Sequence, residues 1–197
     1  MIENLIKEAE SLVEKNVPFE FWKIIELAEE EMQKLEPKTE GYVENGVVVD
    51  GNLSLGKGSV VKAGSRVEGN VFVGKNCIIG PNAYLRKGTI IADNCFVGTS
   101  EIKNSIILND SKIPHFSYVG DSLIGRNCNL GAGTKIANLR HDNKSVKVNL
   151  NGNKVDSGRR KLGALFFDNV KTGVNSTINC GAILEKDSKV LPNEFRK

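Results

Sequence analysis

Residues 49–102 read VDGNLSLGKGSVVKAGSRVEGNVFVGKNCIIGPNAYLRKGTIIADNCFVGTSEI. In this run a branched apolar residue recurs at every sixth position, and the nine positions are Val49, Leu55, Val61, Val67, Val73, Ile79, Leu85, Ile91 and Val97. Three residues after each of the first eight stands Gly or Asn, without exception. These two residue types adopt a positive φ most readily. The run therefore predicts a tight corner at every sixth residue.

A period of six fits neither an α-helix nor the simple alternation of a half-buried strand. It is typical of a parallel β-helix of hexapeptide repeats, in which each repeat supplies a short strand and a corner. One repeat cannot bury its apolar side alone, so successive coils must stack to form a continuous core. We therefore predict a mainly β fold, a parallel β-helix, with a sandwich of irregular short strands as the alternative.

The register is interrupted near the middle of the chain. The next apolar positions are Ile102 and Leu108, and Pro114 stands where an aliphatic residue is expected. The register resumes at Val119 and holds through Ile136. Because sequence rules fail most often at functional sites, we expect this irregular stretch to carry function.

Residues 1–38 carry a helical pattern instead. Apolar residues mark one face of a first helix up to Val13, and residues 16–18 end it. A second amphipathic helix begins near Phe21 and stops before Pro37. We expect a helical hairpin that caps the open end of the β-helix or, because its spacing also suits a coiled coil, makes an oligomer contact.

Residues 39–197 form the predicted β-helix domain, but residues 139–161 leave the repeat. Within this excursion Asn151-Gly152 lies between two strand-like segments, a strong signal for a hairpin with a two-residue turn. The excursion holds seven bases and two acids. It is either a solvated arm or a device for holding phosphate groups. The six-residue period returns at Phe166.

Charge and composition restrict the function classes. Residues 1–40 carry a net charge of −6 and the rest of the chain +9. The bases are scattered without interleaved aromatic residues, so we expect no nucleic-acid partner but an anionic small substrate or cofactor. No apolar stretch approaches the roughly 20 residues that span a bilayer, and nothing resembles a signal peptide. We expect a cytoplasmic protein without a membrane partner.

Cysteines and histidines give little sign of a metal site. Cys77 and Cys95 are 18 residues apart and would stack at about 4.8 Å, near disulfide distance. Cytosolic thiols usually stay reduced, so we expect the cysteines to be buried fillers. With only His115 and His141, the three-histidine zinc site of hexapeptide carbonic anhydrases is not expected. We predict no metal.

The segment after the register break is more specific than the repeat. Residues 115–134 read HFSYVGDSLIGRNCNLGAGT, and Asn138 follows. This combination resembles the acetyltransferase domain of bifunctional N-acetylglucosamine-1-phosphate uridyltransferases. The sequence SGRRKLGA at residues 157–164 resembles the archaeal-type sugar-1-phosphate nucleotidyltransferases that carry the same domain. The resemblance covers roughly residues 40–192.

The resemblance implies a triangular, left-handed β-helix, a handedness opposite to that of ordinary crossovers. It implies a homotrimer with its sites between neighbouring subunits. The implied reaction is acetyl transfer from acetyl-CoA to the amine of glucosamine 1-phosphate. His115 matches the general base for the attacking amine, a role that suits a side chain exchanging protons near neutral pH.

Other residues match the family's substrate contacts by position. Tyr118, Asn129 and Asn138 match residues that hold the sugar and orient the groups around the thioester. Arg86 and Lys103 match the pair that binds the phosphate, and two cations suit a dianionic ester.

For coenzyme A, Ala132 matches a contact close to the transferred acetyl group. Arg159, Arg160 and Lys161 of the basic excursion are further candidate contacts to this co-substrate. The chain also departs from the family pattern, because Phe167 stands where the pattern usually has Gly and only about one and a half coils follow the excursion. We therefore expect a less complete coenzyme A site.

Residues 1–40 contain no Gly-rich nucleotide loop, so uridyl transfer is not expected of this chain. We predict a sugar-phosphate N-acetyltransferase that acts without a nucleotidyltransferase domain. One alternative is a non-catalytic trimeric scaffold that binds a separate nucleotidyltransferase. Another is an acyltransferase for a different amino sugar or for a hydroxyl acceptor. The sequence does not specify the sugar phosphate or the acyl group.

Overall fold

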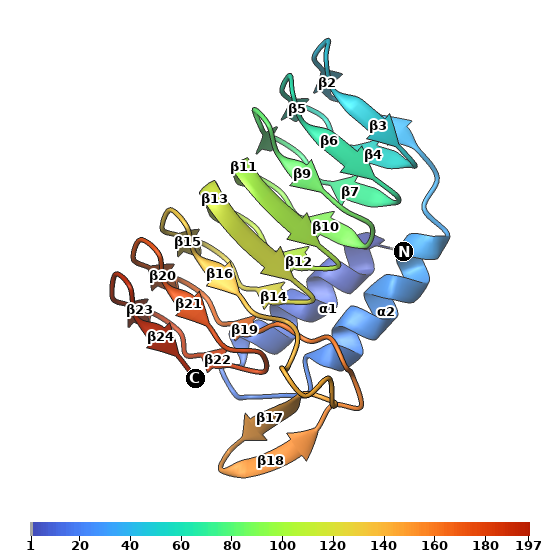
Figure 1. Ribbon diagram of the computed structural model, residues 1–197. Helices are drawn as coiled ribbons and strands as arrows, with labels where there is room; N and C mark the ends of the chain where they lie inside the picture. Colours follow the sequence, from blue (N-terminus) through green and yellow to red (C-terminus); the bar gives the residue numbers. More distant parts are fainter. Residues whose placement is uncertain (1) are drawn as a thin grey trace.

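Coils of about 18 residues stack into a left-handed parallel β-helix, with two helices packed along its side (Figure 1). The computed structural model describes residues 2–197. Val61 pairs in register with Ile79, and Ile79 pairs with Val97, so residues 18 apart lie directly above one another. Their side chains fill the interior in about nine turns. The predicted fold class is confirmed.

The strands lie on three faces of the β-helix, and the first face is a sheet of its own. From the N-terminal to the C-terminal coil it stacks β1 (Lys38–Thr39), β4 (Leu53–Leu55), β7 (Val71–Val73), β10 (Thr89–Ile91), β12 (Ile106–Ile107), β14 (Leu123–Ile124), β19 (Leu165–Phe166) and β22 (Ile183–Leu184).

The second and third faces share one sheet. Two strands, β11 (Phe96–Lys103) and β13 (Lys112–Gly120), run around the corner and join the faces. The second face further holds β2 (Tyr42–Val43), β5 (Val60–Val61), β8 (Ile78–Ile79), β15 (Asn129–Leu130), β20 (Lys171–Thr172) and β23 (Lys189–Val190). The third face further holds β3 (Val48–Asp50), β6 (Arg66–Glu68), β9 (Tyr84–Leu85), β16 (Lys135–Ile136), β21 (Thr177–Ile178) and β24 (Phe195–Arg196).

The interrupted register is a shortening of the repeat. Interior residues after Val97 are Ile102, Ile107 and Ile113, so two successive steps are five residues long. The predicted interior positions Leu108 and Pro114 are therefore wrong by one residue. Leu108 instead packs outward, in the cluster that holds the helices.

Most corners adopt the conformation that the Gly and Asn pattern predicts. Positive φ is found at Gly58, Gly64, Asn76, Asn82, Gly88 and Asn94. At the other two corners it falls one residue earlier, on Gly51 and Gly69. This frees Asn52 and Asn70 for another contact. Their side-chain amides donate to the carbonyls of Leu35 (3.2 Å) and Met32 (2.6 Å), at the end of the second helix.

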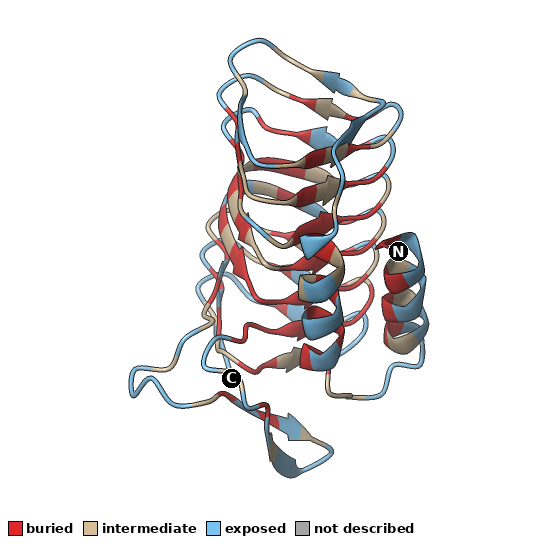
Figure 2. Cartoon of the chain, turned by 90° about the vertical axis from the view of Figure 1, so that its right-hand side faces the viewer, coloured by how far each residue is buried: buried red, intermediate tan, exposed pale blue. Residues whose placement is uncertain are grey.

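The helical hairpin lies along the first face and does not cover an open end (Figure 2). It consists of α1 (Ile2–Glu14) and α2 (Trp22–Gln33). Their apolar sides pack on the outward side chains of this face, including Ile90, Leu108 and Phe167. The prediction of an end cap is thus wrong, whereas the oligomer contact stays a prediction. No described helix is long and apolar enough to span a membrane.

The basic excursion leaves the coil between β16 and β19. An antiparallel bridge between Leu139 and Lys161 closes its base, and the hairpin predicted around Asn151-Gly152 is present as β17 (Lys147–Leu150) and β18 (Asn153–Asp156). Arg159 reaches back to α2, where both terminal nitrogens of its guanidinium contact the carboxylate of Glu29, at 2.5 and 3.1 Å. The excursion is therefore bound to the helical hairpin through this ion pair.

Phe167 departs from the family pattern, and its packing against the helical hairpin explains why an aromatic residue stands at this position. The ring is 1% exposed and meets Phe19 edge-on at 6.5 Å between centroids. We expect Phe167→Ala to lower the free energy of unfolding by about 3–5 kcal/mol, because it opens a cavity under the hairpin. Urea denaturation measures this loss. The control Phe195→Ala, at a residue 53% exposed, should change it by at most about 0.5 kcal/mol. Equal effects would contradict this packing.

Glu29 makes the contact of α2 with Arg159 and Asn104 dependent on pH. Burial raises the pKa of its carboxyl, but hydrogen bonds from Arg159 and Asn104 outweigh this and hold the pKa below its ordinary value near 4.5. A group with a lowered folded-state pKa stabilises the fold above its unfolded-state pKa, and the contribution is lost as pH falls through the folded-state pKa. We expect Glu29→Gln to destabilise the protein at neutral pH.

This difference between Glu29→Gln and the native chain should shrink as pH falls below about 4.5. Unfolding curves of both chains at neutral pH and near pH 3 provide the measurement. A difference that is the same at both pH values would show that the charge of Glu29 contributes nothing.

Candidate functional site

A line of polar side chains follows the outside of the third face. Tyr84, Glu101 and Tyr118 come from successive coils and are paired in register. Arg86 lies two residues after Tyr84, just past β9, and Lys103 lies two residues after Glu101, at the end of β11. Both are therefore nearer the next corner. Inward positions of the same strands carry buried aliphatic residues, so alternation along the strand places these polar groups outside.

One extra residue follows His115 in β13. Thr99 pairs with His115 and Glu101 pairs with Tyr118, so β13 has one more residue than β11 between the two pairs. The strand turns there through Phe116, whose φ is +50°. His115 is exposed at the corner between the second and third faces. At most about 10 Å of backbone separates it from Tyr118.

Asp121 is the centre of the hydrogen bonds at the next corner. Its buried carboxylate accepts from Lys103 Nζ (3.1 and 3.2 Å), Asn104 Nδ2 (2.9 Å) and Asn138 Nδ2 (2.5 Å). Asn104 Nδ2 also donates to Glu29 Oε1 at 2.6 Å. The helical hairpin is thus connected to the third face through this carboxylate.

Tyr118 and Asn138 are left with groups that a ligand can use. Asn138 Nδ2 donates to the Tyr118 hydroxyl oxygen at 3.0 Å and to Asp121, which uses both of its hydrogens. Among the described residues, the Tyr118 O–H and the side-chain oxygen Oδ1 of Asn138 have no partner and can bind a ligand. Burial, and then the charge of Asp121, raises the pKa of Tyr118, so the hydroxyl stays a donor.

Gly120 allows this pair to form. A Cβ atom there would lie 2.6 Å from the Tyr118 hydroxyl oxygen and 2.7 Å from Asn138 Nδ2. Any larger residue would push the two side chains apart.

Arg86 is held on the third face by its neighbours. Its guanidinium donates to Glu101 Oε1 at 2.8 Å and lies over the ring of Tyr84, 5.5 Å from the centroid. The hydrogen bond to Glu101 raises the pKa of Arg86, so it remains a cation. Its Nε atom is buried without a hydrogen-bond partner among the described residues.

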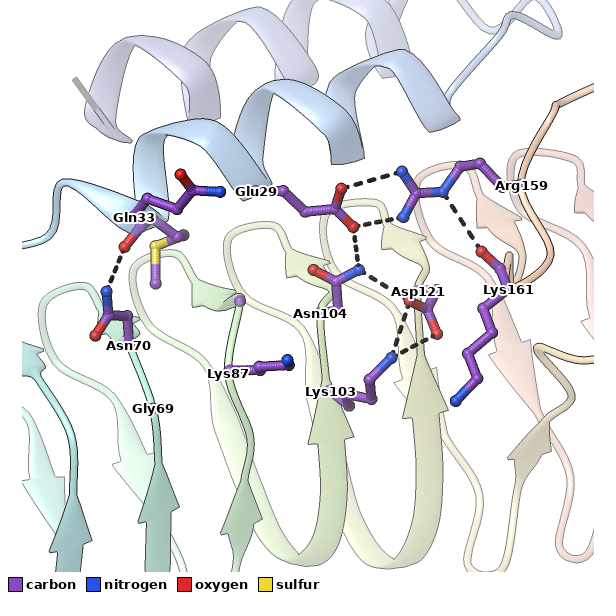
Figure 3. A pocket seen from close by; sticks show the side chains of 12 residues that line it. Glu29, Gln33, Gly69, Asn70, Lys87, Lys103, Asn104, Asp121, Arg159 and Lys161 are labelled. Carbon is purple, nitrogen blue, oxygen red and sulfur yellow. Dashed lines mark hydrogen bonds and ion pairs between the residues drawn. The ribbon is translucent and has the colours of Figure 1, made fainter.

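A pocket of about 630 Å³ opens between α2 and the corner that carries Asp121 (Figure 3). We call it the corner pocket. Its charged lining residues are Glu29, Lys87, Lys103, Asp121, Arg159 and Lys161. The remaining lining residues are Met32, Gln33, Gly69, Asn70, Gly88 and Asn104. The pocket adjoins the Tyr118 and Asn138 pair through Asp121, which belongs to both.

The structure brings some predicted site residues together and separates others. Lys103, Tyr118 and Asn138 meet around Asp121, and Arg159 and Lys161 line the adjoining pocket.

The other predicted residues lie further away. His115 and Ala132 share the corner between the second and third faces, where the N–H of Gly133 binds the His115 carbonyl. Asn129 lies on the second face, and Arg160 is exposed beside Asn143.

Asp121, Glu101 and Lys87 were not assigned to the site from the sequence. Asp121 follows Gly120 in the quoted motif, and Glu101 falls at an outward repeat position between Arg86 and Tyr118. Glu101 could have been found by marking polar residues at outward positions. Glu29 could not, because only the folded hairpin brings it to this corner.

The family model described as the GMPPB C-terminal domain matches residues 67–194. A protein of Methanococcus maripaludis named bifunctional protein GlmU is 54% identical over 173 residues, which are 87% of this chain and 42% of the relative. A bifunctional sugar-1-phosphate nucleotidylyltransferase/acetyltransferase of Sulfurisphaera tokodaii is 53% identical over 92 residues, 47% of this chain and 23% of the relative. The chain thus spans less than half the length of these relatives.

Among solved structures, the acetyltransferase domain of PglB from Neisseria gonorrhoeae aligns with 89% of this chain and 65% of its own. The TM-score is 0.39 and the sequence identity 14%. The sequence matches confirm the resemblance that residues 115–138 predict. The chain therefore belongs to the family of the GMPPB C-terminal domain.

Proposed function

We propose that the chain transfers an acetyl group from acetyl-CoA to the amine of an amino-sugar phosphate, with glucosamine 1-phosphate as the first candidate. The observation that carries this proposal is the hydrogen-bonded group around Asp121, which leaves the Tyr118 O–H and the side-chain oxygen Oδ1 of Asn138 free beside a cationic pocket. A sugar needs such mixed donors and acceptors, and its phosphate needs cations.

In the proposed reaction the amine nitrogen attacks the thioester carbonyl carbon. A carbon–nitrogen bond forms, and the carbon–sulfur bond breaks. His115 takes the proton that the amine loses and gives it to the departing sulfur, which leaves as the thiol of coenzyme A. A positioned base of this kind contributes about 10²–10⁴ in rate. The exposed imidazole at the strand bulge is accessible to both substrates.

Coenzyme A has a candidate surface on the C-terminal side of Asn138. A second pocket of about 650 Å³ is lined by Ala137 and Leu139 and, within the excursion, by Arg140 and Lys147. The coil from Ala132 to Ala137 spans at most about 17 Å, so an elongated thioester can extend from this pocket to the corner of His115. Basic and apolar groups together suit a phosphorylated nucleotide with an aliphatic arm.

A homotrimer completes this proposal. His115 and Ala132 lie at a different corner from Asn138, and Asn129 lies on the second face. Phe116, beside His115, is 68% exposed, which suits contact with a neighbouring subunit. A second copy against this corner would bring groups from two faces into one site.

His115→Ala should lower the rate of thiol release from acetyl-CoA, with glucosamine 1-phosphate as acceptor, by about 10²–10⁴. The substitution removes the group that accepts the amine proton. The control is Lys57→Ala, which shortens an exposed side chain that lines neither pocket and should leave the rate within about twofold.

Activity that survives His115→Ala would remove this residue from its role and leave the reaction in place. No thiol release from the native chain, with other amino sugars also tried, would contradict the proposed function and favour the scaffold alternative.

A further inference from the structure

The side-chain amide of Asn138 can occupy the same space in two orientations, because its oxygen and its NH2 group are similar in size. In the structure the NH2 group faces inward. Asn138 Nδ2 lies 3.0 Å from the Tyr118 hydroxyl oxygen and 2.5 Å from the carboxylate of Asp121. The orientation decides whether this amide offers a ligand an acceptor or a donor.

Asp121 determines which orientation is adopted. The Tyr118 hydroxyl cannot, because a hydroxyl both donates and accepts and so pairs with either end of an amide, whereas a carboxylate only accepts. The Asp121 side chain is 2% exposed and is held by Lys103 Nζ at 3.1 Å and by Asn104 Nδ2 at 2.9 Å (Figure 3). A fixed, acceptor-only group therefore turns the NH2 group of Asn138 inward and its oxygen away.

The turn at this corner does not require a carboxylate. The same corner in the two preceding coils is formed by Gly88 and Asn104, which have positive φ values of 79° and 47°, and Asp121 has 52°. The three positions stack, because a Cβ atom on Gly88 would lie 2.5 Å from Asn104 Oδ1, and Asn104 donates to Asp121. Burying a charge is costly. The carboxylate thus adds a hydrogen-bond acceptor that the turn itself does not need.

The orientation of Asn138 also orients Tyr118. Because the hydroxyl oxygen accepts from Asn138 Nδ2, its O–H is directed elsewhere. Burial raises the pKa of Tyr118, so the hydroxyl keeps its proton. The pair therefore presents one donor, the Tyr118 O–H, beside one acceptor, Asn138 Oδ1. An amine N–H and a hydroxyl oxygen on adjacent carbons, as in a 2-amino sugar, are complementary to this pair.

We propose that Asp121 is a positioning residue for the acceptor. By fixing the amide of Asn138, it makes the site accept a hydrogen bond from the sugar amine while Tyr118 donates to the adjacent hydroxyl oxygen. Asp121 acts through Asn138 and not by contact with the sugar. This inference rests on the proposed function.

The test begins with two single substitutions of similar shape. Asp121→Asn replaces one carboxylate oxygen by an NH2 group, although donors face both oxygens in the native chain. Asn138→Asp sets two carboxylates against each other. Each should lower kcat/KM for glucosamine 1-phosphate by about 10- to 100-fold, because a hydrogen bond to a charged group is lost.

The reciprocal variant, Asp121→Asn combined with Asn138→Asp, sets one donor against one acceptor again and leaves an oxygen at position 138 for the ligand. Its kcat/KM should exceed that of both single variants. This recovery separates the contact with Asn138 from the contact with Lys103, because only the former is restored. A reciprocal variant no better than either single variant would overturn the proposal. If Asp121→Asn does not fold, Asn138→Asp and the reciprocal variant still provide the comparison.

The matched control is Asp168→Asn. Asp168 is another buried carboxylate, with its side chain 8% exposed and bound to Arg126 at 2.6 Å, and it lines neither pocket. This substitution should lower the thermal midpoint but leave kcat/KM for glucosamine 1-phosphate within about twofold. An equal loss of kcat/KM in Asp168→Asn and Asp121→Asn would show that Asp121 only stabilises the fold.

A measurement without turnover separates this proposal from the proposed function. The NMR signal of the Asn138 side-chain amide is assigned by its absence in Asn138→Asp. Its hydrogens should exchange slowly with solvent in the native chain and in Asp168→Asn, and about tenfold or more faster in Asp121→Asn. If no sugar is acetylated, the proposed function fails, and this exchange rate still decides whether Asp121 fixes Asn138. An exchange rate that Asp121→Asn does not change would overturn the positioning role.

Discussion

The buried carboxylate of Asp121 accepts hydrogen bonds from Lys103, Asn104 and Asn138 at a corner where the backbone is left-handed. A buried charge is costly unless it is paired and its lone pairs are satisfied. The partners come from the preceding coil and from the start of the excursion, and Asn104 extends the contact to Glu29 of α2. The hydrogen bonds to this one carboxylate therefore fix the preceding coil, the excursion and the helical hairpin relative to one another. They also fix the side chains of the candidate site.

The six-residue pattern predicts the fold because aliphatic spacing and corner residues agree through Val97. The predicted register of interior positions failed where the first face carries apolar side chains on both its inner and its outer side. In Ile106-Ile107-Leu108 three apolar residues adjoin, and alternation cannot show which one points inward. The cause is the hairpin, which buries the outward residues of this face. The same outward residues, including Ile90, were the signal that the hairpin packs on the side.

The site was predictable to the extent that its residues belong to one motif. Tyr118, Asn138 and Lys103 lie close together because they occupy outward positions in neighbouring coils. Their central partner, Asp121, was missed because a carboxylate at a corner looks like an ordinary turn residue. The roles of Arg159 and Lys161 depend on where the excursion folds back, which no local pattern determines.

A crystal structure with glucosamine 1-phosphate and coenzyme A bound tests the central claim most directly. We expect the sugar to lie against Tyr118 and Asn138, with its amine near a His115 imidazole of the same or a neighbouring subunit. A sugar phosphate bound away from Asp121, or an amine far from every His115, would contradict it.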